Sequence, residues 1–185
     1  MPDQPRLDYP SPPLTDGTVT LRRWDKIDLD CVEQAAEDPA IPRGTTVPRT
    51  FTPAEGLAWI ERQWSRAEDG TGLSQAVADA ASGEALGAAV LMTRRLGIVE
   101  IGYWLVPRAR SRGIGSRAVE LLAHWAVKEG GLARVEALVT PDNVASQRIL
   151  EKARFQREGL LRSYLSYEGQ RFDAVIYALL PSDLT

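Results

Sequence analysis

Residues 100–115 read EIGYWLVPRARSRGIG, and this stretch decides the fold that we expect. The apolar, alternating segment from Ile98 to Val106 is typical of a strand, which Pro107 ends. After a short loop, apolar residues recur at helical spacing, at Ile114, Ala118, Leu121, Leu122 and Trp125. The sequence therefore predicts a strand, a glycine loop and a helix in direct succession.

The glycine loop, residues 110–115, has the composition of a site for a phosphate-containing ligand. Gly113 and Gly115 let backbone N–H groups approach an anion, and the N-terminus of the following helix adds about half a positive charge. Four arginines with no acidic residue among them form a local basic patch, at Arg108, Arg110, Arg112 and Arg117. The loop lacks the lysine of a Walker A loop and the third glycine of a dinucleotide fingerprint. We expect a pyrophosphate here, with a plain strand-to-helix turn as the alternative.

The composition argues against several other classes of protein. The formal net charge of -3 gives no general attraction to nucleic acid. No apolar run approaches the roughly 20 residues that span a bilayer, and the N-terminus lacks the pattern of a secretory signal, so we expect a cytoplasmic protein. One cysteine, Cys31, and one histidine, His124, are too few for a structural metal site. We expect structural roles for both.

The rest of the chain predicts one α/β domain over residues 17–185, after a loosely held, proline-rich arm over residues 1–16. Strands are expected near residues 18–24, 73–80, 86–93, 98–106 and 134–139, followed by a hairpin over 155–180. Helices are expected near residues 28–38, 52–68, 114–130 and 143–153, with residues 39–50 as a loop. This order predicts a mixed sheet with helices on both faces.

Two segments together resemble the GNAT N-acetyltransferases, in particular their RimJ/RimL-like branch. Residues 100–107 followed by Arg-x-x-Gly-x-Gly at 110–115 are similar to the acetyl-CoA motif of that family, and residues 143–155 are similar to its Asn-x-x-Ser/Ala helix. The likeness covers about residues 17–181. Arg154 departs from the family, which usually has glycine before the phenylalanine, so we expect a less tightly turned exit from that helix.

The resemblance implies a GNAT-type, mostly antiparallel mixed sheet whose fourth and fifth strands, near 98–106 and 134–139, splay apart. The pantetheine arm of acetyl-CoA would enter this opening and pair with strand backbone. The resemblance implies that Leu105 and Val106 contact the arm and the thioester, and that Asn143 and Ser146 contact the cofactor from the opposite side. The residues implied at the pyrophosphate are Arg110, Arg112, Gly113, Ile114, Gly115 and Ser116. No metal is implied.

Acetyl transfer to an amine needs a base for the ammonium proton and an acid for the departing thiolate. Strand alternation puts Glu100 on the thioester-facing side of its strand, so Glu100 is the first candidate base, acting through water over roughly 13 Å. Glu158 is the second candidate. Many family members protonate the thiolate with a tyrosine at the position where this chain has Leu150. Ser146 is then the candidate acid, with simple hydrogen bonding to the cofactor as the alternative role.

The sequence thus predicts an N-acetyltransferase that acts on a primary amine, either a small molecule or a protein N-terminus. Residues 39–50 and the aromatic residues Trp59, Trp64 and Tyr164 are expected on the acceptor side. An acidic lining there would indicate a polycationic antibiotic, and an open groove a peptide. The alternative is a non-catalytic acyl-CoA-binding regulatory domain. No nucleic acid or membrane partner is expected, and a homodimer is left open.

Overall fold

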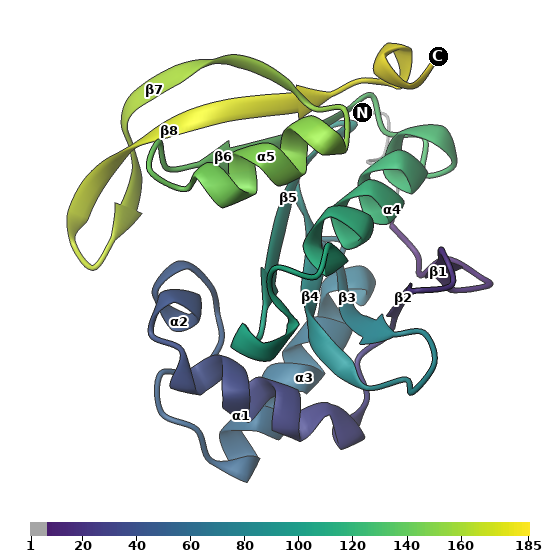
Figure 1. The fold of residues 1–185 in the computed structure, drawn as a ribbon, viewed down its shortest axis with the longest axis vertical. Coiled ribbons are helices and arrows are strands. Elements are labelled where there is room, and N and C mark those ends of the chain that lie inside the picture. The colour runs from purple at the N-terminus through teal and green to yellow at the C-terminus, as the bar shows by residue number, and fades with distance from the viewer. Residues whose placement is uncertain (1–6) are drawn as a thin grey trace.

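The computed structural model describes residues 7–185 and shows a mixed α/β architecture (Figure 1). Its strands are β1 Leu14–Thr15, β2 Val19–Arg22, β3 Gly72–Asp79, β4 Ala85–Arg95, β5 Ile98–Leu105, β6 Arg134–Val139, β7 Gln156–Tyr167 and β8 Gln170–Leu179. Its α-helices are α1 Leu29–Glu37, α2 Ala40–Gly44, α3 Pro53–Glu68, α4 Ile114–Lys128 and α5 Val144–Lys152. Among these residues, no helix combines the length and apolar content that a membrane span requires.

The strands form one sheet in the order β1-β2-β3-β4-β5-β6-β8-β7. Only the contact between β5 and β6 is parallel, and all other neighbours are antiparallel. A parallel pair needs a crossover between its strands, and here α4 provides it. The predicted fold class, a mixed and mostly antiparallel sheet flanked by helices, is confirmed.

Helices cover both faces of the sheet. On one face, Trp104 of β5 stacks against Trp24 at a centroid distance of 6.1 Å and packs against Trp59 of α3. On the other face, Leu105 lies against the first turn of α4, because a Cβ at Gly115 would be only 3.5 Å from its Cδ1. Neighbouring residues of β5 therefore point to opposite layers, as strand geometry requires.

The sheet opens between β5 and β6. These strands pair only from Ile98 opposite Arg134 to Glu100 opposite Glu136, while β5 continues to Leu105. β6 pairs with β8 along its other edge and leaves β5 after Glu136, so residues 101–105 of β5 have no strand partner on the β6 side within the described chain. Figure 1 shows β5 running between the layer of α1–α3 and the group of α5, β6, β7 and β8. The predicted splay is confirmed.

Two expectations about irregular segments were wrong. Residues 1–6 of the expected arm lie outside the described residues, but residues 7–16 are packed against the domain. Leu7 is only 4% exposed, the Tyr9 hydroxyl donates to the carbonyl of Ser74, and β1 pairs with β2. The prolines and the lack of a periodic apolar pattern predicted a loose arm, but these contacts bury apolar surface that does not depend on such a pattern. Likewise, residues 39–50 include the short helix α2 rather than only a loop.

The exit from α5 also differs from expectation. Arg154 adopts a left-handed φ of 67°, its N–H donates to the carbonyl of Glu151, and the N–H of Phe155 donates to that of Leu150. These two bonds form a Schellman motif, which ends a helix with one left-handed residue that is usually glycine. The turn is therefore as tight as with glycine, and Arg154 carries the backbone strain.

We predict that Arg154→Gly stabilises the protein. Relief of the left-handed strain, about 1–2 kcal/mol, exceeds the added entropy of the unfolded chain, about 0.5–1 kcal/mol. Urea denaturation should show an unfolding free energy higher by roughly 0.5–1 kcal/mol. As a control, Glu120→Gly in the exposed interior of α4 should lower it by about 1 kcal/mol. A destabilised Arg154→Gly variant would contradict the strain at this position.

Candidate functional site

The glycine loop begins α4 with a row of unused hydrogen-bond donors. Gly113 is the N-cap, has a φ of 77° and offers no side chain to cap the helix. Within the described residues, the N–H groups of residues 111–116 donate no backbone hydrogen bond, and the first one made in this helix is from Arg117 to the carbonyl of Gly113. Six successive free N–H groups at a helix N-terminus form a site that favours an anion.

The two glycines serve different purposes. A Cβ on Gly113 would meet nothing within 4 Å, so this position is open to a ligand. A Cβ on Gly115 would lie 3.2 Å from Cδ1 of Ile149, so Gly115 instead permits the close packing of α4 on α5. Ile114 is buried beneath the loop, only 4% exposed.

Three of the four arginines of the basic patch form ion pairs with carboxylates of the same chain. Arg110 donates to the carbonyl of Leu105 at 2.9 Å and pairs with Asp38 at 2.5 Å. The other pairs join Arg108 to Glu84 and Arg117 to Asp16. Of the four arginines, only Arg112 has no ion pair within residues 7–185. The attraction for an anion at this loop therefore comes mainly from backbone N–H groups, with Arg112 as the side chain still available.

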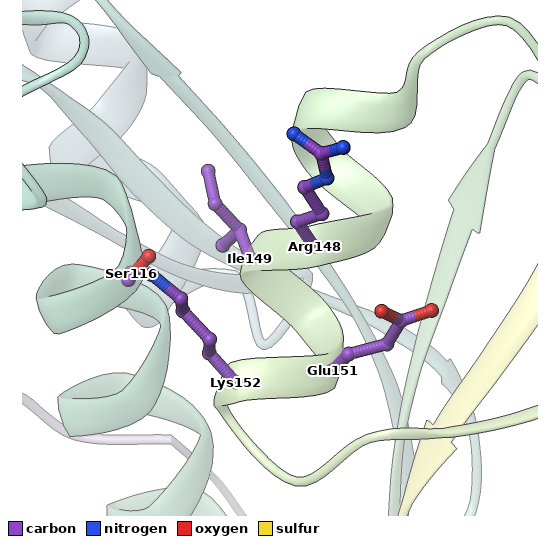
Figure 2. A pocket seen from close by; sticks show the side chains of 5 residues that line it. All are labelled: Ser116, Arg148, Ile149, Glu151 and Lys152. Atoms are coloured by element: carbon purple, nitrogen blue, oxygen red, sulfur yellow. The ribbon is translucent and has the colours of Figure 1, made fainter.

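A cavity of about 400 Å³ lies beside the loop, between α4 and α5. It is lined by Ser116, Arg148, Ile149, Glu151 and Lys152. Figure 2 shows the Lys152 side chain reaching from α5 toward Ser116 on α4. Sequence reasoning missed Arg148 and Lys152, although their spacing of four residues places them on one face of a helix. The cavity continues the anion site with two further cations.

The start of α5 faces the unpaired part of β5. The side chain of Asn143 caps the helix by accepting from the N–H of Ser146. The carbonyl of Ser146 accepts from the hydroxyl of Tyr103 at 3.3 Å, which joins β5 to α5 across the opening. Burial raises the pKa of Tyr103, so the hydroxyl stays protonated at neutral pH. Sequence reasoning missed Tyr103, which strand alternation places on the face opposite Glu100.

The backbone groups at the end of β5 are largely engaged. The carbonyl of Leu105 accepts from Arg110, the N–H of Val106 donates to Leu86, and the carbonyl of Val106 accepts from Ala109. Any ligand contact by Leu105 and Val106 through these carbonyls must therefore use a second lone pair.

Three carboxylates lie near the last rung between β5 and β6, and each has an arginine partner. Arg94 binds Glu100 through Oε2 only, at 2.9 Å, so Oε1 has no protein donor among the described residues. Arg134 donates hydrogen bonds to Glu136 and to both carboxylate oxygens of Glu158. This hydrogen bonding lowers the pKa of Glu158, which makes it a weaker base. Glu136, opposite Glu100 in the register, was missed because sequence alone does not give strand pairing.

The remaining singled-out residues are mostly structural. Cys31 is 2% exposed, and burial raises the pKa of its thiol to about 12. His124 donates from Nε2 to the carbonyl of Ala153 and so joins α4 to the end of α5. Trp59 is buried in the core, and the Trp64 indole donates to the carbonyl of Trp24. Tyr164 is 55% exposed on β7.

The sequence of the chain matches a family model over residues 18–156, that of the acetyltransferase (GNAT) domain. The chain belongs to the GNAT acetyltransferase family. The free N–H groups, the open Gly113 and the splay beside them fit the pyrophosphate and the extended arm of that family's cosubstrate, acetyl-CoA.

Individual GNAT proteins resemble the chain to different extents. The uncharacterised N-acetyltransferase p20 of Bacillus licheniformis is 27% identical over 88% of this chain and 92% of its own. The uncharacterised N-acetyltransferase YoaA of Bacillus subtilis is 36% identical, but the match covers only 44% of this chain and 46% of that protein. The structure of Mycobacterium smegmatis RimJ in complex with CoA-disulfide has a TM-score of 0.80 at 23% identity, over 93% of this chain and 87% of that one.

We predict that acetyl-CoA stabilises the protein and that Gly113→Val removes this effect. A ligand that binds only the folded state stabilises by about 2.7 kcal/mol at a hundredfold excess over Kd. Valine at Gly113 would block the open side of the N–H row. Differential scanning calorimetry with and without acetyl-CoA measures both effects.

Gly131→Val is the matched control for this experiment. Gly131 also has a positive φ, 67°, and open space around its Cβ, but it lies past the other end of α4. Both variants should lose similar stability without ligand, and only Gly131→Val should keep the shift. Retention of the shift in Gly113→Val would place the phosphate site elsewhere.

Proposed function

We propose that this GNAT protein transfers the acetyl group of acetyl-CoA to a primary amine. The observation that carries the proposal is the continuous path formed by the N–H row of residues 111–116, the unpaired stretch of β5 and the carboxylate of Glu100. Bound acetyl-CoA supplies an acetyl thioester. The residues of the chain hold it and move two protons.

The proposed binding residues follow from the geometry. Backbone N–H groups of Arg112, Gly113, Ile114, Gly115 and Ser116 hold the pyrophosphate, and Lys152 and Arg148 supply positive charge from the cavity beside them. Arg110 fixes the loop to β5 through the Leu105 carbonyl and acts as a positioning residue. Asn143 orders the start of α5 on the opposite side of the opening.

Glu100 is the proposed base. An ammonium group must lose a proton before it attacks, since the pKa of an α-amine is about 8 and that of a lysine about 10. Oε1 of Glu100 is free to accept from a water molecule, whereas both oxygens of Glu158 are held by Arg134. The contact with Arg94 holds the carboxylate in one orientation on the α3 face of β5.

Two hydroxyl groups are available for the departing thiolate. Ser146 lies in the first turn of α5, and Tyr103 meets its backbone from β5. The two residues thus lie on opposite walls of the opening. Leu150, by contrast, is fully buried in the core. We propose that Ser146 or Tyr103 donates the proton.

Release of free thiol from acetyl-CoA in the presence of a panel of amines tests the function itself. The panel contains small amines and peptides with free N-termini, and thiol is measured with a colorimetric reagent. A non-catalytic acyl-CoA-binding domain would bind acetyl-CoA and release no thiol with any amine.

Glu100→Gln should lower kcat by roughly 100-fold while acetyl-CoA affinity stays nearly constant, because only proton removal is affected. The loss should shrink as pH rises, since a growing fraction of the amine is already neutral. Steady-state kinetics over a pH series measures this. Glu136→Gln is the matched control on the neighbouring strand and should have little effect. A Glu100→Gln enzyme with an unchanged pH–rate profile would contradict the assignment.

Substitution of the two hydroxyl residues should identify the acid. Removal of the acid, by Ser146→Ala or Tyr103→Phe, should lower kcat by 10-fold or more with little change in KM. The other substitution should have a much smaller effect. If both variants retain normal kcat and pH dependence, the thiolate leaves without help from either residue.

A further inference from the structure

A second cavity, of about 370 Å³, lies along α3, away from the phosphate loop. Its lining includes two arginines one helical turn apart, Arg62 and Arg66, together with Thr46, Gln63, Asp69 and Thr71. We call this cavity the arginine pocket. It plays no part in the acetyl-CoA site described above.

The arginines of this pocket lack carboxylate partners. Arg66 is half-buried and donates from Nε to Oε1 of Gln63. Gln63 is itself 1% exposed and is fixed by donation to the carbonyl of Trp59. No ion pair involves Arg62 or Arg66 anywhere in residues 7–185, although most other arginines around the site have one. Burial lowers the pKa of Arg66, yet a guanidinium remains charged at neutral pH. A partly buried, unpaired cation indicates a place for an anion.

The arginine pocket lies on the side of α3 away from β2. Trp64 points toward β2, since its indole donates to Trp24 and Arg23 lies over its ring. Arg62 and Arg66 are each two residues from Trp64, about 200° around the helix, and so face away from β2. The pocket ends at Thr71, whose carbonyl accepts from the N–H of Thr93 on β4.

The strand register gives the distance between the end of the pocket and the proposed base, Glu100. Gly72 lies opposite Met92, and Met92 lies opposite Glu100, in one row across β3, β4 and β5. Two strand spacings separate the ends of this row by about 10 Å. The charged residues that line the pocket are two arginines, Arg62 and Arg66, and one acidic residue, Asp69. The pocket therefore keeps a net positive charge.

We infer that the arginine pocket binds a carboxylate of the acceptor, and that the acceptor is an acidic peptide with a free N-terminus. This inference rests on the proposed function, which places the reacting amine within reach of Glu100 through a water molecule. About 10 Å is too long for the carboxylate of a single amino acid and matches about three extended residues. A carboxylate side chain at the third or fourth residue of a peptide reaches it. Arginine lining disfavours a polycationic acceptor, which it would repel.

The test compares two amidated peptides, Ala-Ala-Glu-Glu-Ala-Ala and Ala-Ala-Gln-Gln-Ala-Ala. With the wild-type enzyme, KM for the glutamate peptide should be at least 10-fold lower, because a charged hydrogen bond is lost with glutamine. Arg66→Gln should remove most of this difference and leave KM for the glutamine peptide and kcat nearly unchanged. Arg62→Gln, at an exposed position, gives a second variant whose folding is not at risk. Titration calorimetry of the glutamate peptide should show the same loss of binding without turnover.

Arg157→Gln on the exposed face of β7 is the matched control, and should leave the preference intact. Equal KM values for the two peptides in the wild type, or an unchanged preference in both pocket variants, would overturn the inference. Acetylation of small amines without binding of either peptide would overturn it while the proposed function stands. If acetyl-CoA causes no thermal shift and no amine releases thiol, the proposed function itself fails.

Discussion

The structure depends on the interruption of backbone pairing between β5 and β6 after Glu100. Up to that residue the two strands form a parallel ladder, and beyond it β6 continues along β8 while β5 continues to Leu105 with β4 as its only strand partner in the described chain. A strand in the middle of a sheet normally has both edges paired, because buried backbone polar groups are costly when they have no partner. The opening is stable here because α4 and α5 pack against each other across it, with Gly115 allowing their close contact, and because Tyr103 bridges it to α5.

The proposed phosphate site relies on the backbone more than on side-chain charge. The arginines beside the glycine loop are paired with Asp16, Asp38 and Glu84, carboxylates from three other segments, so they hold the loop in place. The N–H groups of residues 111–116 donate no backbone hydrogen bond in the described chain and are held in place with the loop. Such groups need no rearrangement when a phosphate binds, and they act most strongly where water is excluded.

Charge pairing also organises the segments around the proposed base, Glu100, and the β7–β8 hairpin. Glu100 has Arg94, Glu136 and Glu158 share Arg134, and Glu168 at the hairpin turn has Arg43 and Arg49. The Glu168 contacts tie α2 and the loop after it to the β7–β8 hairpin, so both segments border the same space. Against this background of neutral pairs, Arg62 and Arg66 line one pocket without a carboxylate partner in the described chain.

The sequence by itself determined the elements whose signals are local. Thr52 and Pro53 predict the start of α3, and Thr52 indeed caps it by accepting from the N–H of Glu55. The hairpin turn at Gly169 and the glycine loop before α4 were equally readable, because turn and helix-start chemistry depends on adjacent residues. Only the tertiary structure decided the roles of the charged residues. Arg110 and Asp38 are 72 residues apart and Arg117 and Asp16 are 101 apart, so no local pattern could show that the basic patch is neutralised. The same holds for Glu136 beside Glu100, for Tyr103 against α5 and for the unpaired Arg66, because strand register and helix packing bring these groups together or keep them apart.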